Sequence, residues 1–232
     1  RCLVFKQDAP LGKLDAAPVV CAQPRAVDTH VPQVRLYLPH CFVAGHTRYD
    51  IAVRRTLTVH CAGPAPAAQE SAALPGWTWQ PSDAQDAQFE AIAAWCTEAG
   101  VRNVLPPVLL DVLEPRWPHQ GPAFDTPFDL IYCANMLHIA PWSACAGLMA
   151  GAARQLASGG RLVTYGPYFE TDQPAAPGNL AFDESLRARD PAWGIRQLDD
   201  VAAQAERHGL ALQQRHAMPA NNLLLVFAAA AS

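Results

Sequence analysis

Apolar side chains recur at the spacings of strands and helices from about residue 72 to the C-terminus. Short apolar runs predict strands, and these runs are 77–80, 101–110, 128–133, 161–165, 210–216 and 223–227. Apolar residues at i, i+3, i+4 and i+7 predict helices, which begin near Phe89, Ser143 and Leu198. Ser143 is suited to cap the second helix, and glycines at 100, 159 and 209 are suited to end the helices.

Strands and helices alternate along this part of the chain, which predicts an α/β fold with a parallel sheet between helices on both faces. The run 128–133 is apolar almost throughout and is expected to be buried on both faces. Only Met218–Asn222 joins the last two strands, and so short a connection allows a hairpin. We therefore expect a mostly parallel sheet with an antiparallel C-terminal hairpin.

Residues 1–71 have a different character. Prolines at 10, 18, 24, 32 and 39 interrupt any long helix, and only short apolar pieces at Val34–Leu38 and Thr56–Val59 are strand candidates. This part carries eight Lys or Arg against five Asp or Glu, whereas the remainder carries nine against sixteen. The sequence thus divides into an irregular N-terminal segment, 1–71, and a regular domain, 72–232.

Of the 232 residues, 50% are hydrophobic and 16% are charged, a balance typical of a globular protein with a sizeable core. A net charge of −4 argues against nucleic-acid binding. No apolar run reaches about 18 residues, so no membrane span is expected, and Arg1–Leu14 lack the pattern of a signal peptide. Seven cysteines are an odd number, and three lie inside apolar patterns, which favours reduced thiols and a cytoplasmic location.

Several segments of the regular part occur together in one known family. They are, in chain order, Trp79–Asp83, Phe128–Ile139, Gly151–Arg154, Tyr165–Tyr168, Phe182–Arg187, Arg189–Arg196 and Met218–Leu223. Their order and spacing, over roughly two thirds of the chain, resemble the methyltransferase-like protein 26 family. The resemblance implies a Rossmann-like class I methyltransferase sheet, S-adenosylmethionine (SAM) as cofactor, and methyl transfer to a small-molecule or protein acceptor.

Members of that family carry a first strand that runs into a glycine-rich turn before the Trp79–Asp83 segment, where the backbone approaches the methionine part of SAM. The corresponding stretch here, Thr58–Ala67, contains one glycine and two prolines. One hypothesis is that residues 1–71 are non-native and come from a frameshifted or misjoined reading frame. The other is that this chain is a diverged member that lost the loop.

Two carboxylates at predicted strand ends are candidate cofactor ligands. Asp83 follows a strand whose end, in related sheets, carries an acidic side chain that binds the ribose hydroxyls; a helix N-cap is the alternative. Asp111 ends the next strand, where the resemblance implies a contact with the adenine amino group; a solvated turn residue is the alternative.

The segment after the strand 128–133 faces the cofactor crevice in folds of this kind. Backbone groups of Ala134 and Asn135 are expected beside the methionine part of SAM, and Asn135 is also a candidate to orient the substrate nucleophile. A plain turn residue is the alternative for Asn135. His138 has the ordinary pKa of a general base, but a histidine between Leu137 and Ile139 is more often a packed core residue.

Substrate residues are expected at the same rim, after the strand 161–165. Tyr165, Tyr168 and Glu170 are the candidates, with wall packing as the alternative. An insertion before the last helix forms either a lid over an anionic or aromatic substrate or a salt-bridged surface element. Its charged and aromatic residues are Asp183, Arg187, Arg189, Asp190, Trp193 and Arg196.

No metal site is expected. His40, Cys41, His46, His60 and Cys61 are near one another in sequence, but no pairing has the spacing of a zinc site. A serine hydrolase is also disfavoured, because the sequence has no G-x-S-x-G elbow.

The preferred function is therefore methyl transfer from SAM. One rival is a non-catalytic methyltransferase-like binding or scaffold protein, which the missing glycine-rich turn favours. A second rival is a nicotinamide oxidoreductase, which also needs a glycine-rich loop and which the closing hairpin disfavours. The sequence leaves the methyl acceptor and the oligomeric state open.

Overall fold

The computed structural model describes residues 34–35, 48–49, 55–60 and 76–230, with side chains from residue 76 onwards. Its main feature is a mixed eight-stranded sheet in the order β5-β4-β3-β6-β7-β10-β9, with β8 paired to β7. Strands β3 to β7 pair in parallel, whereas β10 is antiparallel to both β7 and β9. The predicted mostly parallel sheet and its antiparallel C-terminal hairpin are thus confirmed.

The elements have the following bounds. The strands of the sheet are β3 (Arg55–His60), β4 (Thr78–Asp83), β5 (Val108–Leu109), β6 (Phe128–Ala134), β7 (Leu156–Phe169), β8 (Arg196–Gln197), β9 (Leu210–Met218) and β10 (Asn222–Ala229). The helices are α2 (Phe89–Glu98), α3 (Ser143–Gln155), α4 (Pro177–Arg189) and α5 (Leu198–Arg207), with short 3₁₀ turns η1 (Asp86–Gln88), η2 (Met136–His138) and η3 (Pro219–Asn221). A two-stranded antiparallel ladder joins β1 (Val34–Arg35) to β2 (Arg48–Tyr49).

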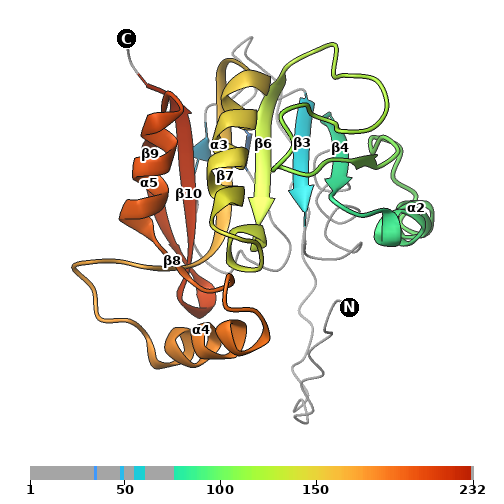
Figure 1. Cartoon of the computed structure of the whole chain (residues 1–232). Coiled ribbons are helices and arrows are strands. Elements are labelled where there is room, and N and C mark those ends of the chain that lie inside the picture. The colour runs from blue at the N-terminus through green and yellow to red at the C-terminus, as the bar shows by residue number, and fades with distance from the viewer. Residues whose placement is uncertain (1–33, 36–47, 50–54, 61–75, 231–232) are drawn as a thin grey trace, which may run out of the picture.

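Helices α3 and α5 lie side by side on one face of the sheet and enclose the larger hydrophobic cluster (Figure 1). Helix α3 lies very close to the segment that follows β5. An added Cβ on Gly151 would be 2.1 Å from the Trp117 ring, and one on Gly147 would be 2.2 Å from the Val112 carbonyl oxygen. Larger residues at these two positions would therefore push the helix away from that segment.

Strand β6 is buried on both faces, as its apolar run predicts. Ile131 and Cys133 belong to the cluster beneath α3 and α5, whereas Leu130 and Tyr132 belong to a second cluster that contains Trp79. The alternation follows the two-residue period of a strand. This central strand therefore holds the two clusters in register.

Two predicted helix ends differ from the structure. Helix α3 begins at Ser143 with Trp142 as its N-cap and without a side-chain capping bond, so the predicted cap by Ser143 is wrong. The same helix ends at Gln155, and β7 begins at once and runs through the glycines that were expected to end the helix. By contrast, Gly100 and Gly209 follow α2 and α5 in the left-handed region, as predicted.

Helix α4 lies within the insertion and was not predicted from the sequence. Only Asn179 and Leu186 of its residues are buried, so the helix has almost no apolar stripe for a periodicity to reveal. Figure 1 shows α4 beyond the ends of the strands toward which the arrows of β3 and β6 point. The helix therefore sits over the carboxyl edge of the parallel strands.

Strand β3 precedes residue 72 and lies in the centre of the sheet, between β4 and β6. It contains the Thr56–Val59 piece that the sequence offered as a strand. The backbone of residues 55–60 thus belongs to the same sheet as the regular domain. Of the other candidate, Val34–Leu38, the described residues are Val34–Arg35, which form β1.

The helices among the residues that the structure describes are short or polar. None of them has the length and apolar character needed to cross a membrane.

Cys96, Cys133 and Cys145 are free thiols, and burial raises the pKa of Cys145 to about 12. A thiol with so high a pKa is protonated and unreactive at neutral pH.

Candidate functional site

The carboxyl ends of four parallel strands meet at one edge of the sheet. The pairing registers place Asp83 beside Leu109 and His60 beside Ala134, so β4 ends level with β5 and β3 ends level with β6. Asp83 is the last residue of β4, Asp111 follows β5 by two residues, and Asn135 comes directly after β6. The sheet thus brings all three predicted cofactor positions to the edge where α/β folds bind their ligands.

Asp83 is partly buried at the end of β4. Its Oδ1 accepts a hydrogen bond of 3.1 Å from the Gln85 backbone N–H. Burial raises the pKa of this carboxyl group, and the backbone N–H groups of Gln85 and Ala84 act in the opposite direction. The N-cap residues of η1 and α2 are Gln85 and Gln88, so the alternative role of Asp83 as a helix cap is wrong.

Asp111 closes a turn beyond β5. Its Oδ1 accepts a 2.9 Å hydrogen bond from the Leu113 N–H, and its own N–H donates to His119 Nδ1 at 2.9 Å. The predicted turn role is therefore present. The hydrogen bond from Leu113 uses one carboxylate oxygen of Asp111, and a contact with an adenine amino group would use the other.

Asn135 turns the chain at the end of β6 with φ of 60°, a left-handed conformation that asparagine tolerates better than most residues. Its N–H donates to the Tyr165 carbonyl oxygen at 2.8 Å, and its own carbonyl oxygen accepts from the His138 N–H at 3.0 Å. The turn role is confirmed, and these bonds fix the position of Asn135 against the neighbouring strand β7.

His138 is a buried residue of η2, with 1% of its surface exposed. Neither ring nitrogen has a hydrogen-bond partner among the described residues, and the ring packs edge-to-face against Tyr168 at 5.1 Å between centroids. Burial first, and then the charge of Arg196, lowers the pKa of His138 to about 3, while the Gly194 backbone and Asp183 oppose the shift. These features favour the packed-residue interpretation of His138 over a general base.

The space around His138 is closed by Gly166 of β7. An added Cβ on Gly166 would be 2.4 Å from His138 Nε2 and 3.2 Å from Asn135 Oδ1. The contact with His138 is shorter than any van der Waals separation and the one with Asn135 is tight, so only glycine fits at this position without a shift of its neighbours. Sequence reasoning did not single out Gly166, because its role depends on a tertiary contact.

The three predicted substrate residues lie at the end of β7 but on different faces. Tyr165 belongs to the cluster with Trp79, and its hydroxyl accepts a 2.9 Å hydrogen bond from Asn222 Nδ2. Tyr168 belongs to the opposite cluster, and its hydroxyl donates to Thr164 Oγ1 at 2.9 Å. Burial raises the pKa of Tyr168 above its ordinary value of 10.0. Glu170 forms an ion pair with Arg215.

A cavity of about 250 Å³ lies beside the end of β7 and is lined by Tyr168 and Glu170, though not by Tyr165. Its remaining lining comes from the hairpin tip, the segment after β7 and the start of α4, and it includes Arg215, Asn222 and Asn179. Arg215 and Asn179 have no local signal in the sequence, since they meet the other lining residues only in the folded chain.

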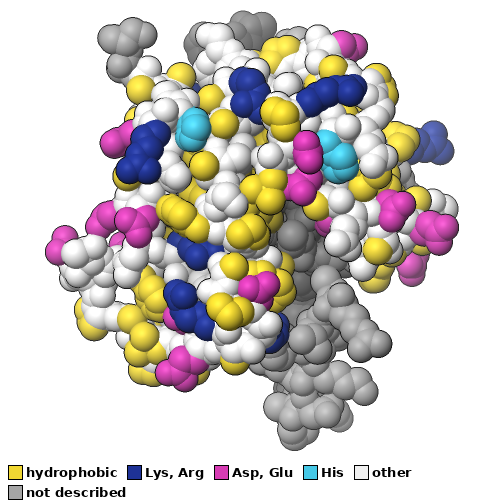
Figure 2. Space-filling view, in the orientation of Figure 1, with side chains coloured by type: hydrophobic (Ala, Val, Ile, Leu, Met, Phe, Trp, Pro, Cys, Tyr) yellow, Lys and Arg dark blue, Asp and Glu magenta, His cyan; other side chains and the backbone are white. Residues whose placement is uncertain are grey.

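The insertion is tied to the β6–α3 connection by Arg196. This side chain donates to the carbonyl oxygens of Leu137 (2.8 Å), Ala140 (2.6 Å) and Ala192 (2.8 Å), and its guanidinium lies 5.6 Å from the Trp142 ring centroid. Within the insertion, Asp183 pairs with Arg187 at 2.8 Å. These contacts fit the predicted salt-bridged element. In Figure 2, Arg side chains lie among hydrophobic ones beside α4.

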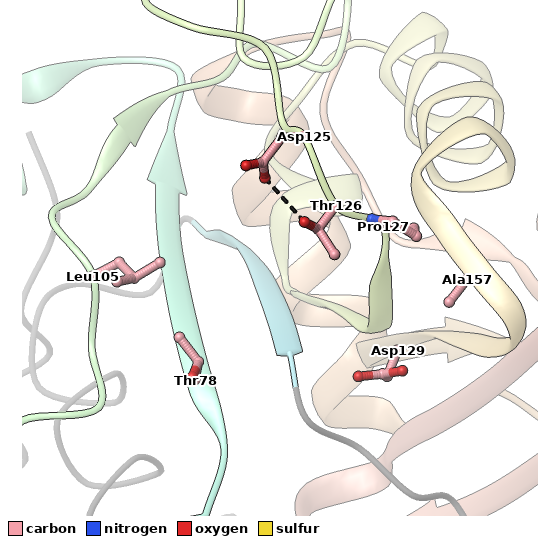
Figure 3. A pocket seen from close by; sticks show the side chains of 7 residues that line it. All are labelled: Thr78, Leu105, Asp125, Thr126, Pro127, Asp129 and Ala157. Carbon is pink, nitrogen blue, oxygen red and sulfur yellow. Dashed lines mark hydrogen bonds between the residues drawn. The ribbon is translucent and has the colours of Figure 1, made fainter.

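A second cavity, of about 620 Å³, lies at the opposite edge of the sheet. Figure 3 shows its lining from the amino ends of β4, β6 and β7, including Thr78 and Asp129, together with Asp125 hydrogen-bonded to Thr126 at 3.1 Å. Ligands of open α/β sheets bind at the carboxyl edge. The larger cavity is therefore the weaker candidate for a cofactor.

Among the described side chains, no group of three or more His, Cys, Asp or Glu has the arrangement of a metal site. The side chains of His40, Cys41, His46, His60 and Cys61 lie outside the described residues. So do residues 61–67, which make up most of the predicted loop position.

A family model described as "Protein of unknown function (DUF938)" matches residues 51–229. The chain belongs to the DUF938 family. This match, together with the fold, confirms the predicted resemblance to the methyltransferase-like protein 26 family. The DUF938 match begins before β3, so it includes the strand in the centre of the sheet.

Solved methyltransferase structures share the fold of this DUF938 member. Mitomycin 7-O-methyltransferase MmcR matches with a TM-score of 0.65 at 16% identity, over 77% of this chain and 49% of that one. An O-methyltransferase family 2 protein from Planctomyces limnophilus, in complex with apigenin, matches with 0.62 at 20% identity, over 75% and 50%. CalO1, a methyltransferase in calicheamicin biosynthesis with S-adenosylhomocysteine (SAH) bound, matches with 0.60 at 14% identity, over 75% and 49%.

This chain spans about half the length of those proteins. Likeness at such low identity shows a shared fold. The fold of the chain is therefore that of the class I SAM-dependent methyltransferases, as the sequence predicts.

Proposed function

We propose that the protein transfers a methyl group from SAM to an acceptor, and that SAM binds at the carboxyl edge of β4, β5 and β6. The observation that carries the proposal is the placement of Asp83 and Asp111 at the ends of neighbouring strands, with Asn135 at the end of β6 on the same edge. In this sheet order, a ligand that spans the three strand ends meets two carboxylates first and the Asn135 turn next.

The donor set suits SAM chemically. The Asp83 carboxylate is partly buried and ends a strand, so its oxygens are suited to accept hydrogen bonds from two adjacent ribose hydroxyls. Asp111 keeps one carboxylate oxygen for the adenine amino group. The turn backbone at Ala134 and Asn135 would lie along the methionine part.

Bound SAM would supply an electrophilic methyl group that passes to the acceptor atom and leaves SAH, while the proton of the acceptor goes to water. The chain's own residues hold and orient the two partners and exclude water. Asn135, fixed by its bond to the Tyr165 carbonyl, is the proposed positioning residue for the acceptor. His138 stays neutral, and its backbone N–H holds the Asn135 turn through the hydrogen bond to the Asn135 carbonyl oxygen.

A methyltransferase-like binding or scaffold protein is the second candidate. The burial of His138, which leaves it a poor base, and the single glycine in Thr58–Ala67 favour this reading. A nicotinamide-dependent enzyme is disfavoured, because β10 lies between β7 and β9 and is antiparallel to both, whereas the nicotinamide-binding sheet is all-parallel. We further propose a cytoplasmic location and a small-molecule or protein acceptor.

Calorimetric titration of the full chain with SAM, followed by competition with NAD, tests the proposal. We expect SAM to bind and NAD not to displace it. Asp83→Asn should weaken SAM binding by roughly ten- to a hundredfold, because hydrogen bonds to a charged acceptor contribute about 1.5–3 kcal/mol. Asp172→Asn, on the exposed loop after β7, is the matched control and should bind SAM normally. Displacement by NAD would refute the assignment.

A further inference from the structure

The smaller cavity at the carboxyl edge has the position of an acceptor site. It lies at the end of β7, and β6, which carries the Asn135 turn, is the strand next to β7. Its volume of about 250 Å³ is below the range of roughly 300–1,000 Å³ that drug-sized ligands occupy. The cavity therefore admits a small molecule, or the reacting arm of a larger one.

A hydrogen-bonded path joins this cavity to the Asn135 turn. Asn222, in the cavity lining, donates to the Tyr165 hydroxyl at 2.9 Å, and the carbonyl oxygen of the same Tyr165 accepts from the Asn135 N–H at 2.8 Å. The cavity wall and the proposed cofactor edge are thus both hydrogen-bonded to one residue, Tyr165.

One wall of the cavity carries both signs of charge. Arg215 Nε donates to Glu170 Oε1 at 2.8 Å, and Arg215 Nη2 donates to Glu170 Oε2. The Arg215 and Glu170 side chains keep 39% and 24% of their surface exposed, so both still reach a ligand. The hydrogen bond with Glu170 is also the main reason that the pKa of Arg215 is raised.

The rest of the lining is uncharged. Asn179 donates to the Asn221 carbonyl oxygen at 3.1 Å, and Leu223 and Tyr168 supply apolar surface. A ligand with a net negative charge would be repelled by the Glu170 carboxylate, and a ligand with a net positive charge would be repelled by the Arg215 guanidinium. An apolar ligand would remove water from both groups and replace none of their hydrogen bonds to water, which is costly.

A ligand with groups of both signs places an opposite charge against each member of the pair. Resting on the proposed function, we propose that this cavity binds the methyl acceptor and that the acceptor is a small zwitterion, with an ammonium and a carboxylate group as in a free amino acid. The ammonium faces Glu170, the carboxylate faces Arg215, and the nucleophilic atom at the other end extends toward β6.

Ligand-observed NMR on the full chain, saturated with SAH, tests this assignment. The probes are the free L-amino acids, including L-homoserine, and the N-acetyl and C-amide forms of each. We expect at least one free amino acid to bind, and its two blocked forms to bind at least about tenfold more weakly, since each blocked form lacks the charged group that faces one member of the Glu170–Arg215 pair.

Single variants separate the two ends of the ligand. Arg215→Gln should lower the affinity for the free amino acid to that for its C-amide form. Glu170→Gln should lower the affinity for the free amino acid to that for its N-acetyl form. Arg207→Gln is the matched control, because Arg207 is an exposed residue of α5 outside the cavity lining. Thermal melting confirms that each variant is folded.

Binding of SAH in the same samples distinguishes the two proposals. If SAH binds and no free amino acid does, or if the blocked forms bind equally well, the zwitterion assignment is overturned and the methyltransferase proposal stands. If an amino acid binds with the expected selectivity and SAH does not bind, the methyltransferase proposal fails and the cavity remains a zwitterion site.

Discussion

Gly166 shows how one residue without a side chain sets the geometry of the site. Its Cα lies against the His138 ring, and that ring is buried and packs edge-to-face against Tyr168 of the same strand. The sequence marks Tyr165–Tyr168 only as a segment shared with a family. The reason for glycine at this position appears once the neighbouring histidine is placed.

Gly166→Ala should destabilise the protein by about 1–3 kcal/mol, because the new methyl group overlaps a ring that has no room to move. Urea unfolding measures the loss. Gly178→Ala is the matched control, since nothing lies within 4 Å of an added Cβ at that helical position. Equal stabilities of the two variants would contradict the close packing.

Asp83 combines an expected function with a cost in stability. Burial raises its pKa in the folded state, so the folded protein holds the proton more tightly than the unfolded chain. Its contribution to stability is therefore lost as the pH rises from the ordinary value of 3.8 through the raised pKa. At neutral pH the ionised carboxyl group destabilises the fold.

Asp83→Asn should therefore raise the melting temperature at pH 7 while it weakens SAM binding, and the gain in stability should vanish near pH 3. Thermal melts at both pH values check this. A variant that melts lower than the wild type at pH 7 would show that the carboxylate supports the fold instead.

His138 should make the protein sensitive to acid. The folded state takes up the proton at a pKa of about 3 and the unfolded state near 6.5, so stability rises with pH across this window. Between pH 7 and pH 5 the wild type should lose about 2 kcal/mol more than His138→Phe, whose ring carries no proton. Urea unfolding at the two pH values measures this difference, and parallel losses in the two proteins would exclude the effect.

At the scale of elements, the sequence predicts those with a buried apolar face, such as the helices that begin at Phe89, Ser143 and Leu198, and misses a helix that lies on the surface. Runs such as 128–133 are apolar because the strand is buried on both faces, and this burial leaves a direct signal. Helix α4 lacks such a signal because it lies on the surface, over the strand ends. The Arg196 contacts, which come from distant parts of the chain, had no local signature at all.

Arg196→Lys should loosen the connection between β6 and α3. Lysine cannot reproduce the fork that bonds the Leu137 and Ala140 carbonyls together, and we expect a loss of about 1–2 kcal/mol. Hydrogen exchange at Gly194, whose N–H donates to the His138 carbonyl oxygen, should become faster. Arg207→Lys, in α5, should leave this exchange unchanged, and faster exchange there as well would point to a global effect.

At the scale of the whole molecule, the sheet order explains which site residues could be predicted. The candidate residues Asp83, Asp111 and Asn135 could be placed at one edge from the sequence, because each follows a recognisable strand and parallel strands share one edge. Arg215 and Asn179 were not found, since β9 and α4 reach the cavity only through the hairpin and the insertion. The larger cavity at the amino edge had no sequence signal either.

A crystal structure of the full chain grown with SAH tests the central claim most directly. We expect the adenosine against Asp83 and Asp111 and the amino-acid part beside Asn135. SAH in the cavity lined by Thr78 and Asp129, or crystals without SAH from millimolar solution, would contradict it.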